Sequence, residues 1–199
     1  MDTINWYCKL LAHLPKPPSD LIDQIDRVYR PSIEKFSTAE SEYIKIDKAD
    51  DWTSQNYNWI KPMASNTNVR HHFKQEYLDW IKNNITSEFD ESNSGVMFFD
   101  TPQLPHTDTT RKFVLLYNVE TGGPDASLVF WQEDKHPILR ERGLAVDRGS
   151  HLKELEKIPG PAGCWYLMNT QVLHSVENVN ERRLNLQISF KENYPTNIC

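Results

Sequence analysis

The sequence lacks the features that mark disulfide-rich, zinc-thiolate or nucleic-acid-binding proteins. It has only three cysteines, Cys8, Cys164 and Cys199, with no CxxC spacing. Neither a disulfide framework nor a thiolate zinc site is indicated, so we expect reduced thiols. No basic cluster is longer than the pair Arg182-Arg183, and the formal net charge is −6. An acidic chain without a basic track disfavours nucleic acid as a partner.

Long apolar runs are missing as well. The longest are only a few residues, such as 113–117, whereas a membrane-spanning helix needs about 20 apolar residues. The first residues carry neither the basic stretch nor the uninterrupted apolar segment of a secretory signal. We therefore predict a cytoplasmic protein without a membrane segment.

Bulky core-forming residues are abundant. Six Trp, eight Tyr and eight Phe occur among 199 residues, which excludes wholesale disorder. A chain of this length can bury roughly 70% of its unfolded surface in one core. We predict a single domain over residues 1–199, with a mixed helical support region at 1–94 and a β-rich core at 95–192.

The support region contains two amphipathic patterns. Residues 18–31 and 71–86 place apolar side chains at three-and-four spacing, which predicts two helices. Residues 5–10 and 42–46 are weaker candidates for strands. The adjacent pair His71-His72 diverges on a helix, so we interpret it as a solvated helix start and not as a metal site.

The core region consists of short strands separated by turns. β-branched and aromatic residues dominate five segments, at 95–99, 113–119, 127–131, 163–168 and 183–190, with Gly- and Pro-rich breakers between them. Short strands in series predict a mainly β fold with flanking helices. We expect a double-stranded β-helix, or jelly roll, buttressed by N-terminal α-helices that cover one sheet.

The residues best suited to chemistry are His106 and Asp108. Side chains at i and i+2 of a strand point to the same side, so these two can converge on one metal ion. His174 follows a later strand-like segment and is the candidate for a third ligand. Two imidazoles and one carboxylate on one face of Fe(II) form a facial triad with open positions, which predicts catalysis. A structural His-Asp hydrogen bond is the alternative.

The last strand-like segment, 183–190, alternates cleanly. Its apolar positions, Leu184, Leu186, Ile188 and Phe190, take one face, and Arg183, Asn185, Gln187 and Ser189 take the other. If the apolar face packs on the helices, Arg183 points into the barrel, where a guanidinium needs a ligand carboxylate. An anionic co-substrate is therefore predicted. The alternative is a surface pair with an acid such as Glu181.

The HxD motif at 106–108, the distal His174 and the following Arg183 resemble the Fe(II)- and 2-oxoglutarate-dependent oxygenase superfamily. The segments 113–118, 122–123, 128–131 and 173–179 are similar in order and spacing to its prolyl-hydroxylase-like branch, over about residues 95–192. The resemblance implies that the triad of His106, Asp108 and His174 binds iron.

The same resemblance assigns the co-substrate site. It implies that Arg183 holds the distal carboxylate of 2-oxoglutarate and that Asn185 takes the place where a small hydroxyl residue often assists. The Asn is a departure from the family pattern. The turn between His174 and Arg183 is also slightly shorter than is common in that branch, so Arg182 is an alternative anchor.

The activity implied by the resemblance is hydroxylation of an unactivated carbon with Fe(II), 2-oxoglutarate and dioxygen, and with ascorbate as an optional reductant. Succinate and carbon dioxide are the expected co-products. A peptidyl side chain, as in prolyl or aspartyl hydroxylation, is the leading substrate, and a free amino acid or other small metabolite is next. The rival from another class is a non-catalytic jelly-roll protein that holds a metal or ligand. The sequence does not indicate an oligomeric state.

Two aromatic residues and one long segment complete the candidates. Trp131 and Tyr117 are candidates for the floor of the substrate pocket, and Tyr117 alternatively for a hydrogen bond to the co-substrate, although strand aromatics more often belong to the core. The polar stretch 132–161 is too long for a tight hairpin connection. It is either a lid over the metal site or a surface segment with a short helix at 150–157.

Overall fold

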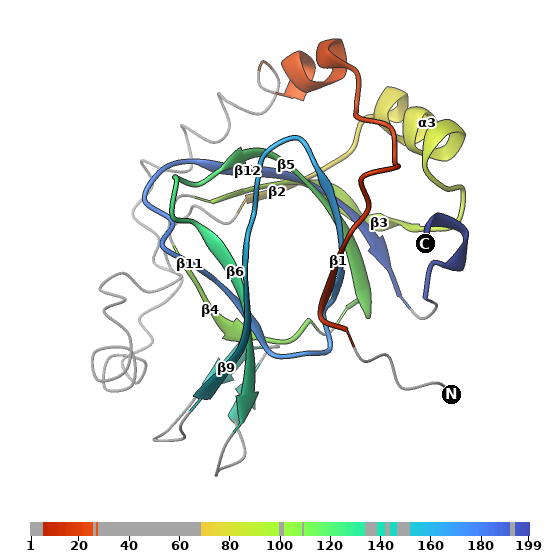
Figure 1. Cartoon of the computed structure of the whole chain (residues 1–199). Helices are drawn as coiled ribbons and strands as arrows, with labels where there is room; N and C mark the ends of the chain where they lie inside the picture. Colours follow the sequence, from red (N-terminus) through yellow and green to blue (C-terminus); the bar gives the residue numbers. More distant parts are fainter. Residues whose placement is uncertain are drawn as a thin grey trace.

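The computed structural model describes residues 6–25, 27, 69–99, 102–108, 110–133, 139–141, 144–146, 152–191 and 194–199. The strand candidate at 42–46 lies outside these residues. The described part is mainly β and forms two six-stranded sheets whose neighbouring strands are all antiparallel (Figure 1).

We call the two sheets A and B. Sheet A has the order β1 (Cys8–Leu10), β10 (Trp165–Asn169), β5 (Phe113–Thr121), β12 (Arg183–Phe190), β3 (Asp90–Phe99) and β2 (Val69–His72). Sheet B has the order β7 (Leu139–Glu141), β8 (Leu144–Val146), β4 (Gln103–His106), β11 (His174–Glu177), β6 (Ser127–Glu133) and β9 (Leu152–Pro159). The five segments predicted as strands correspond to β3, β5, β6, β10 and β12, and β3 begins earlier, at Asp90.

The inner faces of the two sheets pack on each other. One cluster of buried residues combines Phe99, Val114, Leu116 and Met168 of sheet A with Leu128, Phe130 and Val176 of sheet B. From β3 to β6 and again from β9 to β12, the chain passes from one sheet to the other at each step. This arrangement is compatible with a β sandwich.

The alternation predicted for the last strand is confirmed in β12. Its four apolar side chains belong to a cluster on the outer face of sheet A, together with Tyr77 and Ile81 of helix α3 (Gln75–Asn84). Arg183, Asn185 and Gln187 point the other way, into a cavity between the sheets. Burial of each large apolar side chain contributes about 1.5–3 kcal/mol, so this outer cluster holds the strand in the register that aims its polar residues inward.

Helical residues cover the outer face of sheet A. Residues 19–25 are helical and contribute Leu21 and Ile25 to the same outer cluster as α3. Figure 1 shows α3 outside the sheet that contains β5 and β12. Near the C-terminus, the 3-10 turn η2 (Thr196–Ile198) adds Ile198 to this cluster. Among the described residues, no helix has the length and apolar character needed to span a bilayer.

Two local predictions are corrected. The helix expected at 71–86 begins only at Gln75, and His71 and His72 lie on β2, which pairs with β3. Of the short helix considered at 150–157, residues 152–157 lie instead in strand β9, and residues 150 and 151 are outside the described residues. The apolar residues of that segment recur every third position, but β9 pairs with β6 through a register shift, opposite Phe130 and Trp131. Because the bulge changes which side chains face inward, the apolar residues of β9 recur every third position, a spacing that resembles that of a helix.

Candidate metal centre

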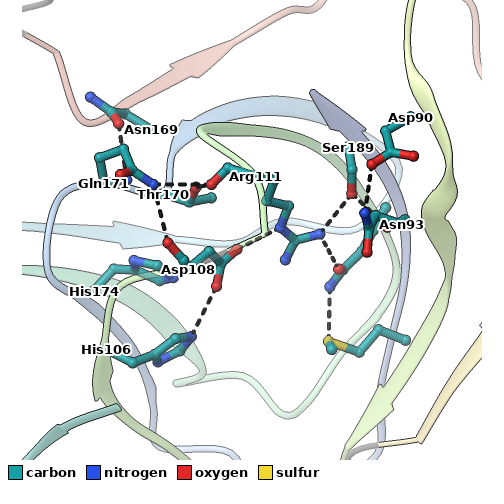
Figure 2. A network of polar contacts seen from close by, with 12 residues as sticks. Asp90, Asn93, His106, Asp108, Arg111, Asn169, Thr170, Gln171, His174 and Ser189 are labelled. Carbon is teal, nitrogen blue, oxygen red and sulfur yellow. Dashed lines mark hydrogen bonds and ion pairs between the residues drawn. The ribbon is translucent and has the colours of Figure 1, made fainter. Parts of the chain in front are cut away.

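His106 and His174 come from neighbouring strands of sheet B. His106 ends β4, His174 begins β11, and the two residues are direct partners in the antiparallel pairing. Asp108 follows two residues after His106. The candidate ligand atoms of these three side chains all lie within 4.8 Å of one another (Figure 2). The structure therefore brings together the triad predicted from the sequence.

His174 is fixed in the orientation that a metal ligand needs. Its side chain is buried, and Nδ1 is 2.8 Å from the carbonyl oxygen of Val172. A carbonyl oxygen only accepts hydrogen bonds, so Nδ1 carries the proton and Nε2 offers its lone pair. The pKa of His174 is lowered to about 3, mainly by burial and to a smaller extent by the nearby His106, so this imidazole is neutral at physiological pH.

Asp108 is held as a carboxylate by a buried arginine. Burial alone would raise the pKa of Asp108, but the positive charge of the Arg111 guanidinium holds it below its ordinary value. Nε of Arg111 donates to Oδ2 of Asp108 at 2.5 Å, while Oδ1 lies 3.7 Å from Nε2 of His106. The site thus offers two imidazole nitrogens and an ionised carboxylate.

A cavity of about 210 Å³ opens onto this triad between the sheets. Besides the triad, its walls carry two arginines, three amide side chains and several apolar residues, among them Arg111, Arg183, Gln103, Asn185, Gln187, Met97, Phe99, Leu116 and Leu128. Such a mixture of convergent polar groups and apolar walls is typical of a small-molecule site.

Arg183 is the second notable group in the cavity. It is 3% exposed, and it donates to the carbonyl oxygen of Thr121 at 2.8 Å and to Oδ1 of Asn118 at 3.2 Å. Its Nε is buried without a hydrogen-bond partner, and its guanidinium carbon lies 5.7 Å from the centre of the Phe99 ring. Burial lowers the pKa of Arg183 to about 10. Among the described residues, no carboxylate lies within ion-pair distance of Arg183.

Arg182, the alternative anchor, is placed differently. Its guanidinium pairs with the Glu120 carboxylate through Nε and a terminal nitrogen, and its side chain is 26% exposed. It does not line the cavity. Of the two neighbouring arginines, only Arg183 faces the triad's cavity.

Tyr117 and Trp131 do not line the cavity, which corrects two predictions. Tyr117 belongs to the outer cluster of sheet A, where its ring centre lies 5.0 Å from that of Trp165. Trp131 packs on the outer face of sheet B with Leu173, and its Nε1 donates to Oγ of Ser175 at 2.8 Å. Successive strand residues face opposite sides, so the inward positions belong to the residues one step earlier in each strand.

Those inward residues, and Asn118, were not identified from the sequence. Leu116 lines the cavity, and the Phe130 ring centre lies 6.3 Å from that of His174. Asn118 accepts from Arg183 and donates to the Gly160 carbonyl oxygen at 3.2 Å. Arg111 was also missed, although its position three residues after Asp108 was a usable signal.

The stretch 132–161 is only partly described. Strand β8 pairs with β4, with Leu144 opposite His106, so this part of the stretch lies beside the candidate metal strand. Strand β9 pairs with the other side of the sheet, along β6. A lid role for this stretch stays a prediction.

Comparisons with known proteins give little further information. No protein-family model matches the sequence, and no curated protein is significantly similar to it. Among solved structures, a prolyl-4-hydroxylase from Pseudomonas putida is similar with a TM-score of 0.40 and 12% sequence identity, covering 96% of this chain and 90% of that chain. A TM-score this low does not establish a shared fold, so the assignment of function depends on the site itself.

Proposed function

We propose that the protein is an Fe(II)- and 2-oxoglutarate-dependent dioxygenase that hydroxylates an unactivated carbon. The observation that carries this proposal is the convergence of His106, Asp108 and His174 within 4.8 Å at a cavity that also contains a buried, incompletely bonded arginine. We also propose that the alternation of the chain between the two sheets is that of a jelly roll.

The donor set fits iron. Two imidazole nitrogens and one carboxylate oxygen form the facial triad that non-haem Fe(II) oxygenases use, and the remaining positions of the ion are left to other molecules. The hydrogen bond from His174 to the Val172 carbonyl oxygen supports this role, because it aims Nε2 at the centre of the triad and raises the basicity of the ligand.

Arg183 fits the distal carboxylate of 2-oxoglutarate. A guanidinium buried without a carboxylate costs free energy, and a ligand carboxylate can restore a charge-assisted pair of hydrogen bonds. Its free Nε supplies one donor for such a ligand. Asn118 and the Thr121 carbonyl oxygen orient the guanidinium, while Asn185 lies two residues along the same face of β12.

Iron held by His106, Asp108 and His174 would, with 2-oxoglutarate and dioxygen, supply the oxidation that converts a substrate C–H bond to C–OH and 2-oxoglutarate to succinate and carbon dioxide. The chain's own residues bind and orient the reactants. Phe99, Leu116 and Leu128 form apolar walls that limit the access of water to the triad.

The size of the cavity supports a substrate that inserts one side chain. Drug-sized ligands occupy pockets of roughly 300–1,000 Å³, whereas this cavity measures about 210 Å³. 2-Oxoglutarate would occupy part of this volume, which favours a substrate that places only a small group, such as one side chain, beside the triad. We therefore propose a peptidyl side chain, in the manner of a prolyl or aspartyl hydroxylase, as the substrate.

Succinate release from 2-oxoglutarate, with Fe(II) and ascorbate, tests the activity. A library of peptides and a set of free amino acids are compared, and hydroxylation is confirmed by a mass increase of one oxygen atom in the substrate. We expect stoichiometric succinate and hydroxylated peptide from the wild-type protein and from Arg182→Ala, and none from His174→Ala. Metal binding without succinate release under any of these conditions would favour a non-catalytic binding protein.

A further inference from the structure

Arg111 makes three side-chain hydrogen bonds beside the triad. It is 7% exposed, and its Nε donates to Oδ2 of Asp108 at 2.5 Å. One terminal nitrogen, Nη1, donates to Oε1 of Gln187 at 2.7 Å and to Oγ of Ser189 at 3.1 Å. Figure 2 shows the guanidinium between Asp108 and Ser189. One side chain thus connects the candidate carboxylate ligand to strand β12.

The main chain around Asp108 is fixed by the turn that follows β10. The Asp108 amide donates to the Thr170 carbonyl oxygen at 3.1 Å, and Gln171 Nε2 donates to the Asp108 carbonyl oxygen at 3.2 Å. The carbonyl oxygen of Arg111 accepts from Thr170 Oγ1 at 2.8 Å and from Gln171 Nε2 at 3.0 Å. The backbone positions of both partners are therefore set before any metal binds.

The two carboxylate oxygens of Asp108 have different surroundings. Oδ2 accepts from Arg111, whereas Oδ1 lies on the side of His106, 3.7 Å from its Nε2. A charge-assisted hydrogen bond occupies one lone pair of Oδ2 and draws electron density from this oxygen, which makes it a poorer ligand. Oδ1 is then the oxygen better suited to bind a metal ion in the triad.

We propose that Arg111 is a positioning residue that makes Asp108 a single-oxygen ligand. This inference rests on the proposed metal site. A carboxylate that bound through both oxygens would use a further coordination position, one that 2-oxoglutarate or dioxygen needs. Gln187 assists by fixing the guanidinium from β12, and its own Nε2 donates to Asn185 Oδ1 at 2.9 Å. A chain of hydrogen bonds thus runs from Asp108 through Arg111 and Gln187 to Asn185. Asn185 lies two residues after Arg183 on β12.

The test uses Co(II) as a probe that needs no turnover. The variants are Arg111→Gln, which removes the guanidinium, and Arg111→Lys, which keeps a positive charge for Asp108 but cannot also reach Gln187 in the same fork. Arg182→Gln is the matched control, because Arg182 pairs with Glu120 outside the cavity. Thermal unfolding of each apo-protein shows whether it is folded.

We expect wild type and Arg182→Gln to bind one Co(II) with equal affinity, and Arg111→Gln to bind it 10–100-fold more weakly, as is usual when a residue that orients a ligand is lost. Infrared difference spectra of protein with ¹³C-labelled aspartate carboxylates report the binding mode. The frequencies of the antisymmetric and symmetric carboxylate stretches should be widely separated in wild type. They should lie closer together in Arg111→Gln, because the freed Oδ2 of Asp108 then also binds the metal ion. If Arg111→Gln does not fold, Arg111→Lys is expected to show a smaller narrowing in the same direction with weaker Co(II) binding, because its ammonium group keeps a charge near Oδ2 but is no longer fixed by Gln187.

Affinities within about threefold of wild type together with an unchanged stretch separation in the folded Arg111 variants would overturn the inference and leave the metal site intact. Failure of the wild-type protein to bind Co(II) would overturn the metal site, and the role of Arg111 with it. A purely structural role for Arg111 would change the unfolding temperature but not the infrared separation.

Discussion

His106 and His174 are paired residues on the neighbouring strands β4 and β11, and their ring centres are 4.3 Å apart. The pairing register of sheet B therefore sets the distance between the two imidazoles. Asp108 joins them after β4 ends, where Arg111 holds its carboxylate. Strand pairing and one buried ion pair thus build the triad before a metal binds.

The stability of the apo-protein should fall between pH 7 and pH 5 because of His174. Its pKa is 6.5 for an unperturbed side chain and about 3 in the folded protein, so the unfolded state binds the extra proton in this window. The stabilising contribution is complete above pH 6.5 and is lost as the pH falls toward 3. Urea unfolding of the metal-free protein at several pH values measures this contribution to the free energy of unfolding.

His174→Gln is the control for this pH dependence, because glutamine does not titrate. Its free energy of unfolding should change less than that of wild type between the same two pH values. Equal pH dependence in both proteins would show that His174 can take up a proton while the protein is folded.

Replacement of Arg183 by Met should weaken 2-oxoglutarate binding without destabilising the folded protein. Removing a buried charge that has no carboxylate partner is neutral or stabilising by up to about 2 kcal/mol, while 2-oxoglutarate loses its proposed anchor. We expect Co(II) affinity to be retained and 2-oxoglutarate affinity to fall at least about tenfold, which is about 1.4 kcal/mol. Isothermal titration calorimetry with each ligand, and thermal unfolding of the apo-protein, measure these effects.

Arg182→Met is the matched control for Arg183→Met and should bind both ligands like wild type. If Arg183→Met loses Co(II) and 2-oxoglutarate equally and is destabilised, Arg183 has a structural role and does not anchor the co-substrate.

Asn118 and Tyr117 are neighbours that face opposite sides of β5, so their variants should behave differently. Asn118→Ala removes the Oδ1 acceptor of Arg183, and we expect 2-oxoglutarate affinity to fall by about 1 kcal/mol, the usual net contribution of one hydrogen bond. Tyr117→Phe removes only a hydroxyl on the outer face of sheet A and should leave this affinity unchanged. A larger loss in Tyr117→Phe than in Asn118→Ala would contradict the orientation of β5.

Trp131→Phe should affect stability and not the site. It removes the hydrogen bond from Nε1 to Ser175 Oγ and part of a buried ring, which costs about 1–3 kcal/mol. We expect a lower urea midpoint and unchanged affinities for Co(II) and 2-oxoglutarate. Weaker 2-oxoglutarate binding at wild-type stability would restore Trp131 as a pocket residue.

The triad and the orientation of β12 could be predicted because the spacing of their residues determines which side chains share one face of a strand. All of β12 is buried, but its alternating apolar and polar residues show which face packs on the outer cluster and which faces the cavity, and the HxD spacing places two ligands on one side. Residues 113–117 are all apolar and both faces of β5 are buried, so the pattern does not show which residues point inward. This explains why Tyr117 was assigned to the cavity in place of Leu116.

Trp131 was assigned to the wrong face for a similar reason. Residues 128–131 are apolar throughout, and β6 is buried on both sides. The three-residue spacing from Asp108 was the local signal for Arg111. Its other contacts, with Gln187 and Ser189, are on a strand far away in the sequence, and local patterns contain no information on them. The three-residue spacing in β9 imitated a helix because a bulge breaks the two-residue alternation of an edge strand.

The most direct test of the proposed iron and 2-oxoglutarate site is the visible absorption of the protein with Fe(II) and 2-oxoglutarate under anaerobic conditions. We expect a charge-transfer band that needs both components, is present in Arg182→Ala and is absent in His174→Ala. A colourless mixture, with no change in thermal stability on adding the two components, would contradict the proposed iron and 2-oxoglutarate site.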